Sequence, residues 1–152
     1  MYFGFSFIGL LFLIMLFIPN VLWNKFQPTD YEKYSKRENI ILLAFERVGQ
    51  VLVCIFSLFC GVNFNLSICV AIPFIILILY EFYWIKYFKS NKTMGDMYSD
   101  FFKIPLPGAT LPVLAFVFLG ICSDNILLIF STIILGTGHI GIHLAHKKEI
   151  NW

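Results

Sequence analysis

The histidines are the residues whose spacing most directly suggests chemistry. The sequence has three, all in one stretch near its end, at positions i, i+4 and i+7: His139, His143 and His146. On a helix this spacing places them along one stripe. Residues 126–135, just before them, are almost wholly apolar, so we expect the stripe to end a membrane-spanning helix. Polar side chains at such a depth are costly and are treated by default as functional.

Two of these histidines have the spacing of a metal site. His139 and His143 lie four residues apart, so both imidazoles could bind one divalent metal ion, with Glu46 or Glu81 as a third ligand. The alternative is that His139 is a hydrogen-bonded packing residue and His143 and His146 are interfacial cations near a helix C-terminus. The HxxxHxxH pattern resembles a fragment of the histidine boxes of membrane di-iron hydroxylases and desaturases. Those enzymes carry several boxes and this chain has one, so we assign no family.

A second group of polar residues lies within another apolar segment. Glu46 and Gln50 share one helical face, with Arg47 beside it, roughly 10–17 Å below the expected membrane surface at about 1.5 Å per residue. A charge in a membrane helix costs at least about 2.5–3.5 kcal/mol on insertion scales. We interpret these residues as facing a polar cavity, the alternative being a structural ion pair or a snorkelling arginine.

Together these residues predict a pocket in the cytoplasmic half of the membrane. The expected catalytic residues are Glu46, Arg47 and His139. The expected substrate-binding residues are Gln50, Glu81 and His143. The metal, if one binds, is expected at His139 and His143.

The elements that must position this pocket are apolar helices. The sequence is 59% hydrophobic and 13% charged, against about a quarter charged in an average soluble domain. We predict an all-α membrane protein, one domain over residues 1–152, with five transmembrane helices in one compact bundle. The expected spans are about 2–23, 39–60, 67–88, 105–122 and 125–146. The first lacks a positively charged lead-in and a cleavage site, so we expect it to be retained.

The fourth span is the weakest of the five. Pro105, Pro107 and Pro112 crowd its start, so its helix is expected to begin near Thr110 as N-cap. A short or re-entrant segment is the alternative.

Charge predicts the orientation. Ten of the eleven basic residues lie in residues 24–38, in 86–103 and in the tail after residue 146. With five spans these regions share one side, whereas four spans would split them. The positive-inside rule then places the N-terminus outside and the C-terminus in the cytoplasm of a cell (plasma) membrane. The opposite side would hold the N-terminus and the turns 61–66 and 123–125.

Several other features have weaker interpretations. Aromatic residues at the expected cytoplasmic ends are interpreted as an interfacial belt: Trp23, Tyr80, Tyr83, Trp84 and Tyr87. Residues 93–103 are expected to lie along the membrane surface or to form an ordinary loop. The four cysteines are expected to be free thiols, with a disulfide between Cys60 and Cys69 as the alternative.

Three functions stay open from the sequence. The first is a membrane-embedded enzyme acting on a lipid-like substrate, with His139 or Glu46 as general acid or base and Arg47 on an anionic head group. The second is a small transporter, or a protein that binds protons or divalent cations. The third is a non-catalytic membrane subunit. The expected partners are membrane lipids and no nucleic acid. The small residues Thr137 and Gly141 also suggest a homodimer through the fifth helix.

Overall fold

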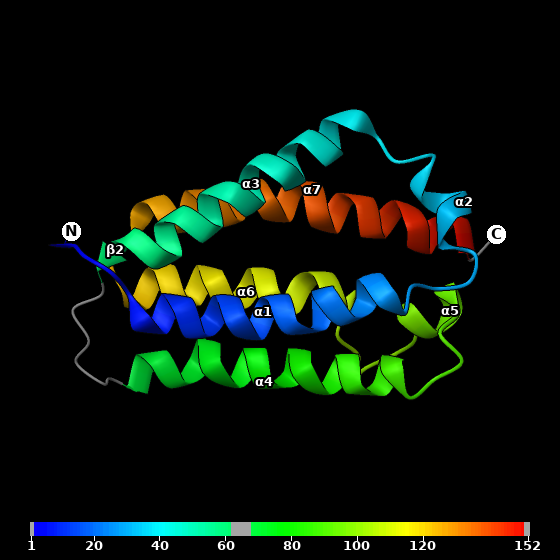
Figure 1. Ribbon diagram of the computed structural model, residues 1–152, viewed down its shortest axis with the longest axis horizontal. Helices are drawn as coiled ribbons and strands as arrows, with labels where there is room; N and C mark the ends of the chain where they lie inside the picture. Colours follow the sequence, from blue (N-terminus) through cyan, green and yellow to red (C-terminus); the bar gives the residue numbers. More distant parts are fainter. Residues whose placement is uncertain (1, 62–67, 151–152) are drawn as a thin grey trace.

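The protein consists of helices that run alongside one another (Figure 1). This computed structural model describes residues 2–61 and 68–150. The long helices are α1 (Phe7–Lys25), α3 (Ile40–Phe59), α4 (Ile68–Phe88), α6 (Pro107–Cys122) and α7 (Ile126–Ile150). Two short helices, α2 (Tyr31–Ser35) and α5 (Met94–Met97), lie in the connections at one end. At the other end, the two-residue strands β1 (Tyr2–Phe3) and β2 (Cys60–Gly61) pair antiparallel. The predicted turn 61–66 lies outside the described residues after Gly61.

Four helices have the length and composition to cross a membrane: Phe7–Lys25, Ile40–Phe59, Cys69–Phe88 and Ile126–Ile150. The all-helical fold is therefore confirmed, apart from the short β1–β2 pair, and four of its helices are candidate membrane spans. The fifth long helix, α6, is apolar but has 16 residues, just under the range of about 17–25 that usually spans a bilayer.

Helix α6 begins earlier than the sequence indicated. It starts at Pro107, not near Thr110, and a proline is well suited to a first turn because its missing N–H would have no helical partner there. The prediction of Thr110 as N-cap is wrong. Its hydroxyl lies inside the helix and donates to the carbonyl groups of Pro105 and Leu106, at 2.8 and 3.1 Å.

Helices α3 and α7 make the most extensive contact between elements, and two glycines set their separation. A methyl group added at Gly49 would overlap the backbone of Leu135, and one added at Gly138 would overlap the backbone of Glu46. Glycine is therefore required at both positions for this close approach. Because the two backbones touch here, side chains on neighbouring positions of α3 and α7 can meet.

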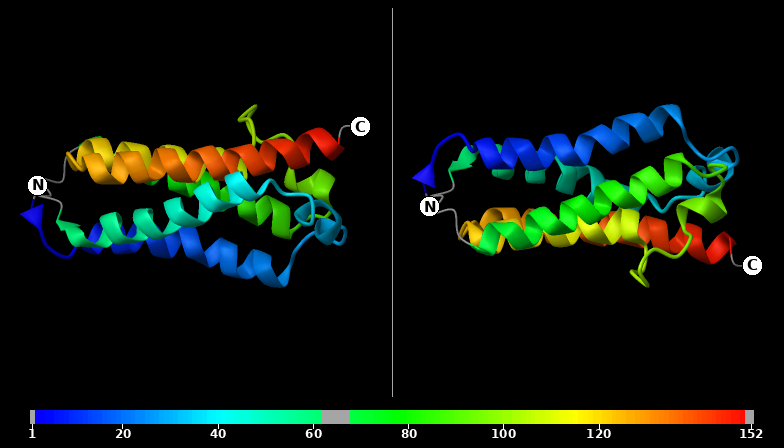
Figure 2. Two further views of the ribbon diagram at one scale, coloured as in Figure 1. Left: turned by 90° about the horizontal axis from the view of Figure 1, so that it is seen from above. Right: turned by 90° about the horizontal axis from the view of Figure 1, so that it is seen from below.

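Helices α1 and α3 touch at one end and separate at the other (Figure 2). The strand pair joins them at the end that carries the N-terminus, where the backbone N–H of Ser6 donates to the carbonyl of Leu58 at 2.9 Å. A methyl group at Gly9 would overlap the carbonyl of Ser57. Toward the opposite end the two helices diverge, which leaves space between them.

The aromatic cluster on α4 is buried, so its interpretation as an interfacial belt is wrong. Tyr80, Tyr83, Trp84 and Tyr87 are at most 4% exposed. The hydroxyl of Tyr83 donates to the carbonyl of Met97 at 2.5 Å, and that of Tyr87 to the carbonyl of Phe26 at 3.0 Å. These rings join α4 to the two connections instead of facing lipid head groups.

The connection after α4 folds back onto the protein. Thr93 and Asp96 form a capping box at the start of α5, in which each side chain accepts from the other residue's backbone N–H. These hydrogen bonds from Thr93 lower the pKa of Asp96. Met94 and Met97 are buried in the core, so this segment packs on the helices, and its place relative to the membrane surface stays a prediction.

One disulfide joins the bundle at the end that carries the N-terminus. Cys69 at the start of α4 is bonded to Cys122 at the end of α6, so the expectation of four free thiols is wrong, as is the alternative Cys60–Cys69 bridge. Both cysteines lie in helix ends that face each other, a relation the sequence spacing of 53 residues did not indicate. Cys54 is free.

Candidate functional site

A cavity of about 600 Å³ lies inside the bundle. This volume is within the range of about 300–1,000 Å³ that is usual for small-molecule sites. All five long helices contribute to its wall, as do α5 and the connection around α2. Its apolar wall includes Leu16, Phe17, Val21, Val53, Trp84, Val113, Phe116 and Leu135. Its polar wall includes Asn20, Asn24, Gln27, Tyr31, Glu38, Glu46, Arg47, Gln50, Tyr98, His139, His143 and His146.

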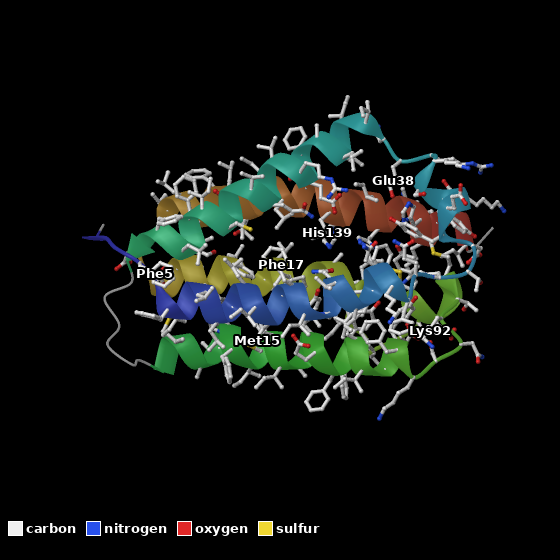
Figure 3. All side chains as sticks on the ribbon, viewed as in Figure 1. Phe5, Met15, Phe17, Glu38, Lys92 and His139 are labelled. Atoms are coloured by element: carbon white, nitrogen blue, oxygen red, sulfur yellow. A yellow bond between two sulfur atoms is a disulfide. The ribbon has the colours of Figure 1, made fainter. Side chains whose placement is uncertain are left out.

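The centre of the polar wall is a pair formed by Glu46 of α3 and His139 of α7. His139 projects from α7 into the interior (Figure 3), and its Nδ1 lies 2.5 Å from Oε1 of Glu46. The contact depends on the close approach at Gly138, the residue before His139. Because a carboxylate only accepts hydrogen bonds, Nδ1 of His139 carries the proton and Nε2 is left as the basic nitrogen. A carboxylate that fixes the tautomer of an imidazole in this way prepares it to act as a general base.

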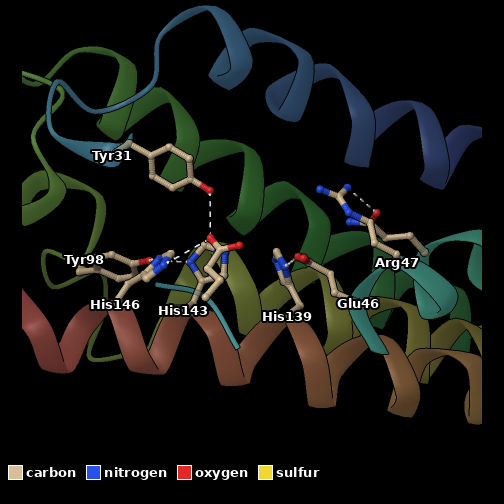
Figure 4. Close-up of polar contacts among 9 residues, drawn as sticks. Tyr31, Glu46, Arg47, Tyr98, His139, His143 and His146 are labelled. Carbon is tan, nitrogen blue, oxygen red and sulfur yellow. Dashed lines mark hydrogen bonds and ion pairs between the residues drawn. The ribbon is translucent and has the colours of Figure 1, made fainter. Parts of the chain in front are cut away.

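A row of further titratable side chains continues from this pair toward the connections (Figure 4). The rings of His139 and His143 lie 4.6 Å apart between centroids. The hydroxyl of Tyr98, in the connection after α5, lies 2.7 Å from Nδ1 of His143 and 3.3 Å from Nδ1 of His146. Since one hydroxyl has one proton, it donates to one of these imidazoles and accepts from the other, according to their tautomers. Burial and nearby groups raise the pKa of Tyr98, which keeps this hydroxyl protonated.

The row ends at a carboxyl group in the connection between α2 and α3. Oε1 of Glu38 lies 3.4 Å from Nε2 of His146 and 3.4 Å from the hydroxyl of Tyr31. This contact is an ion pair only when the imidazole of His146 is protonated. Burial raises the pKa of Glu38, and burial together with the Glu38 carboxylate raises that of Tyr31 to about 12.

The structure brings together five of the six predicted site residues. Glu46, Arg47, Gln50, His139 and His143 all line the cavity. The guanidinium of Arg47 does not pair with Glu46. It donates from Nη1 to Oε1 of Gln50 at 3.4 Å.

Glu81 is the predicted residue that the structure places elsewhere. It is absent from the cavity wall, and its Oε1 is buried without a hydrogen-bond partner among the described residues. Depth along the helix could not distinguish the face of α4 that carries Glu81 from the face that carries Tyr80 and Trp84, which do line the cavity.

The predicted metal ligands do not form a complete set. Within residues 2–61 and 68–150, no three side chains of His, Cys, Asp or Glu are arranged to hold a metal ion. Nδ1 of His139 is taken by Glu46, and Nδ1 of His143 by Tyr98. The divalent metal therefore stays a prediction from spacing alone.

Sequence reasoning missed several residues of the wall. Asn20 and Asn24 lie at i and i+4 on α1 and line the cavity, so their spacing could have identified one polar face. Tyr98 and Glu38 gave no such signal, because each lies in a connection whose path no helical period describes.

The wall is polarised along the helix axis. Toward the end that carries the N-terminus, beyond the level of Arg47 and Glu81, the described parts of the long helices contain no Asp, Glu, Lys, Arg or His. The ionisable groups thus collect at the end where α2 and α5 lie, and the cavity becomes apolar away from it. A head-and-tail molecule matches such a wall better than a uniformly polar one. Comparisons with models of protein families, with curated proteins and with solved structures gave no match.

Proposed function

We propose that this protein is an integral membrane enzyme acting on a lipid-like substrate, with His139 as general base and Glu46 as the residue that orients it. The observation that carries the proposal is a single cavity in which this pair borders an apolar compartment. A general base contributes about 10²–10⁴-fold to a rate when it is within hydrogen-bond reach of the proton that it removes.

The proposal includes an arrangement in the membrane. We infer that α6 crosses together with the four longer helices, that the N-terminus is outside, and that α2 and α5 face the cytoplasm. This places the basic residues on the cytoplasmic side of the plasma membrane, as the positive-inside rule requires. The cavity then opens toward the cytoplasmic leaflet, from which a lipid-like substrate or a soluble second substrate would arrive.

The row of titratable groups supports acid–base chemistry. Tyr98, His143, His146 and Glu38 connect the cavity with the connections at the cytoplasmic end through contacts of 2.7 to 3.4 Å. A proton that His139 removes needs a route to water, and hydroxyl and imidazole groups exchange protons readily. We assign this row the role of exchanging protons with the cytoplasm.

A lipid profile tests the enzyme proposal. Cells that lack the protein would be complemented with the unaltered chain, with Glu46→Gln, with His139→Ala, or with Glu32→Gln as a matched carboxyl-to-amide control at an exposed site. We expect lipid species to differ between the deletion strain and the complemented strain, with Glu46→Gln and His139→Ala resembling the deletion and Glu32→Gln resembling the unaltered chain. Membrane-inserted protein must be present at equal amounts. Identical profiles in all strains, or full activity of His139→Ala, would refute the proposal.

The same row favours one second candidate, a proton-binding or proton-coupled transport protein. Its linked protonatable groups are what a transporter uses. The wall beyond Arg47 lacks charged groups in the described residues, which is why we rank this function second. Proton uptake into proteoliposomes, measured with an internal pH dye, would favour it if Glu46→Gln abolished the uptake.

A further inference from the structure

The cavity has an opening on the side of the bundle, between α1 and α3. These helices are joined at the end with the strands and diverge toward the other end (Figure 2). Val21 and Phe17 of α1 line the cavity and yet are 68% and 45% exposed. Arg47 of α3 likewise lines the cavity and is exposed. Side chains that border an internal space and also face outward mark the place where that space is open.

An apolar surface leads to this opening from the outside. A shallow groove of about 390 Å³ on α1 is lined by Ile14, Phe17, Ile18, Val21 and Leu22. Phe17 and Val21 belong to both the groove and the cavity. The groove and the cavity therefore share this part of their wall, and an apolar surface reaches from the outside to the boundary of the cavity.

The cytoplasmic rim of the opening is rich in hydrogen-bond donors. Arg47 has no carboxylate within ion-pair distance among the described residues, because Glu46 is paired with His139. Asn20 and Asn24, on α1, also line the cavity. Arginine keeps its charge at all physiological pH values and binds carboxylate or phosphate through two parallel hydrogen bonds. A charge without a partner at this depth calls for an anion.

The interior adds a second, independent indication of a ligand. The indole N–H of Trp84 is buried without a hydrogen-bond partner in the described part of the chain, and the residue is 4% exposed. The indole N–H of Trp23 is also buried and unpaired there. Both residues line the cavity. An unpaired buried donor is unfavourable, and a ligand with acceptor oxygens would provide the missing partner.

We infer that the ligand is a single-chain anionic amphiphile of the cytoplasmic leaflet, which enters sideways between α1 and α3. Its anionic group binds Arg47 at the rim, and its chain occupies the apolar compartment lined by Val53 and Phe116. This inference rests on the proposed function, which takes the cavity as the site of a lipid-like substrate. It concerns binding and not turnover, so the two can fail separately.

Binding to the purified full-length chain in a neutral detergent tests the anionic group. Three probes would be titrated and followed by native mass spectrometry and melting temperature: oleoyl lysophosphatidate, oleoyl lysophosphatidylcholine and glycerol phosphate. We expect saturable binding of lysophosphatidate, at least tenfold weaker binding of lysophosphatidylcholine, and no detectable binding of glycerol phosphate. Equal binding of the two lysolipids would overturn the anionic preference, and tight binding of glycerol phosphate would overturn the need for a chain.

Two pairs of variants locate the site. Arg47→Gln should reduce lysophosphatidate affinity at least tenfold, whereas Arg37→Gln, exposed and outside the cavity wall, should retain it. Val21→Trp should fill the opening and reduce the association rate, whereas Ile133→Trp, exposed on α7 and outside both the groove and the cavity wall, should not. Unchanged affinity of Arg47→Gln, or an unchanged rate for Val21→Trp, refutes the corresponding part of the inference.

Lysophosphatidate binding to the unaltered chain, compared with the lipid profile of cells that carry His139→Ala, separates binding from catalysis. If lipid profiles respond to His139→Ala while lysophosphatidate does not bind, the enzyme proposal survives and this inference fails. If lysophosphatidate binds but no lipid profile changes, this inference survives and the enzyme proposal fails.

Discussion

At the scale of single residues, the contact between Glu46 and His139 decides how the cavity works. The two side chains are 13% and 21% exposed, so water screens them little and each leaves the other without a partner when it is removed. The hydrogen bond fixes the imidazole tautomer whichever substrate binds. The pair is therefore a structural link between α3 and α7 as well as the candidate base.

A double-mutant cycle measures that link. Glu46→Ala, His139→Ala and the double variant should give a coupling free energy of unfolding of about 1–3 kcal/mol, as contacting buried residues do. The exposed pair Arg37–Glu149, at 3.9 Å, should give less than about 1 kcal/mol and serves as the control. Free energies would come from reversible unfolding in mixed micelles. Equal couplings for the two pairs would contradict the role given to Glu46 and His139.

The carboxyl group of Glu38 predicts a pH dependence. Burial, and then the charge of Glu46, raise its pKa above the ordinary value of 4.5. The folded state thus holds this proton more tightly, so the group's contribution to stability is complete below about pH 4.5 and is lost as pH rises through the folded pKa. Tyr31, Arg47 and His146 also face the carboxyl group.

Glu38→Gln should remove this contribution. The melting temperature of the unaltered chain, followed from about pH 4 to 8, should fall relative to that of Glu38→Gln as pH rises. Because His146 is present in both proteins, its own titration largely cancels in the difference. Glu32→Gln, at an exposed site on α2, is the control. A difference that is flat with pH would show that Glu38 keeps its ordinary pKa.

What the sequence revealed at this scale depended on periodicity. The stripe of His139 and His143 and the face of Glu46 and Gln50 could be predicted because a helix places residues i and i+4 side by side. Tyr98 could not, since its position depends on how the connection folds around Met94 and Met97. Glu81 was predicted as a site residue from its depth along the helix and does not line the cavity. Depth does not show on which face of the helix a residue lies.

At the scale of elements, glycine determines how α3 and α7 meet. Replacing a helical glycine with alanine normally stabilises a helix by about 1 kcal/mol. At Gly138 the added methyl group would overlap the backbone of Glu46, and overpacking of this kind costs about 1–3 kcal/mol. We therefore expect Gly138→Ala to lower the free energy of unfolding in spite of its better helix propensity.

The same substitution at Gly95 is the control, because a methyl group there meets nothing closer than 3.6 Å. Gly95→Ala should be neutral or stabilising in the same unfolding measurement. If Gly138→Ala behaved like Gly95→Ala, the close approach of α3 and α7 would be incorrect.

The glycine cluster Gly136, Gly138 and Gly141 was visible in the sequence. Its partners were not, and Gly138 and Gly141 face α3 of the same chain. The homodimer stays a prediction, with Thr137 exposed.

The disulfide joins α4 to α6 and predicts a thiol count. Alkylation of the native protein without reduction should leave Cys69 and Cys122 unmodified, and reduction first should add two alkyl groups. Cys69→Ser should lower the free energy of unfolding by about 2–4 kcal/mol, mainly because the unfolded chain loses a cross-link. Cys54→Ser, at the free thiol, is the control. Modification of all cysteines without reduction would contradict the bridge.

At the scale of the whole molecule, the two ends differ in charge and in chemistry. Figure 1 shows α2, α5 and the C-terminus at one end of the bundle. This end holds nearly all the lysines and arginines, and the polar wall of the cavity lies toward it. Hydropathy and charge bias predicted this polarity because a bilayer restricts helices to few arrangements. They could not predict the cavity, which arises because α1 diverges from α3, a feature of packing and not of composition.

Orientation in the membrane follows from that polarity and can be measured directly. In a background with all native cysteines replaced, Asp124→Cys would report on the turn between α6 and α7, and Lys92→Cys on the connection after α4. Disulfides persist in oxidising compartments, so the Cys69–Cys122 bridge favours the proposed orientation in which its end of the bundle faces outward. We therefore expect a membrane-impermeant maleimide to label Asp124→Cys in intact cells and Lys92→Cys only after permeabilisation. The reverse pattern would place the cavity opening in the outer leaflet, and labelling of both in intact cells would mean that α6 does not cross the membrane.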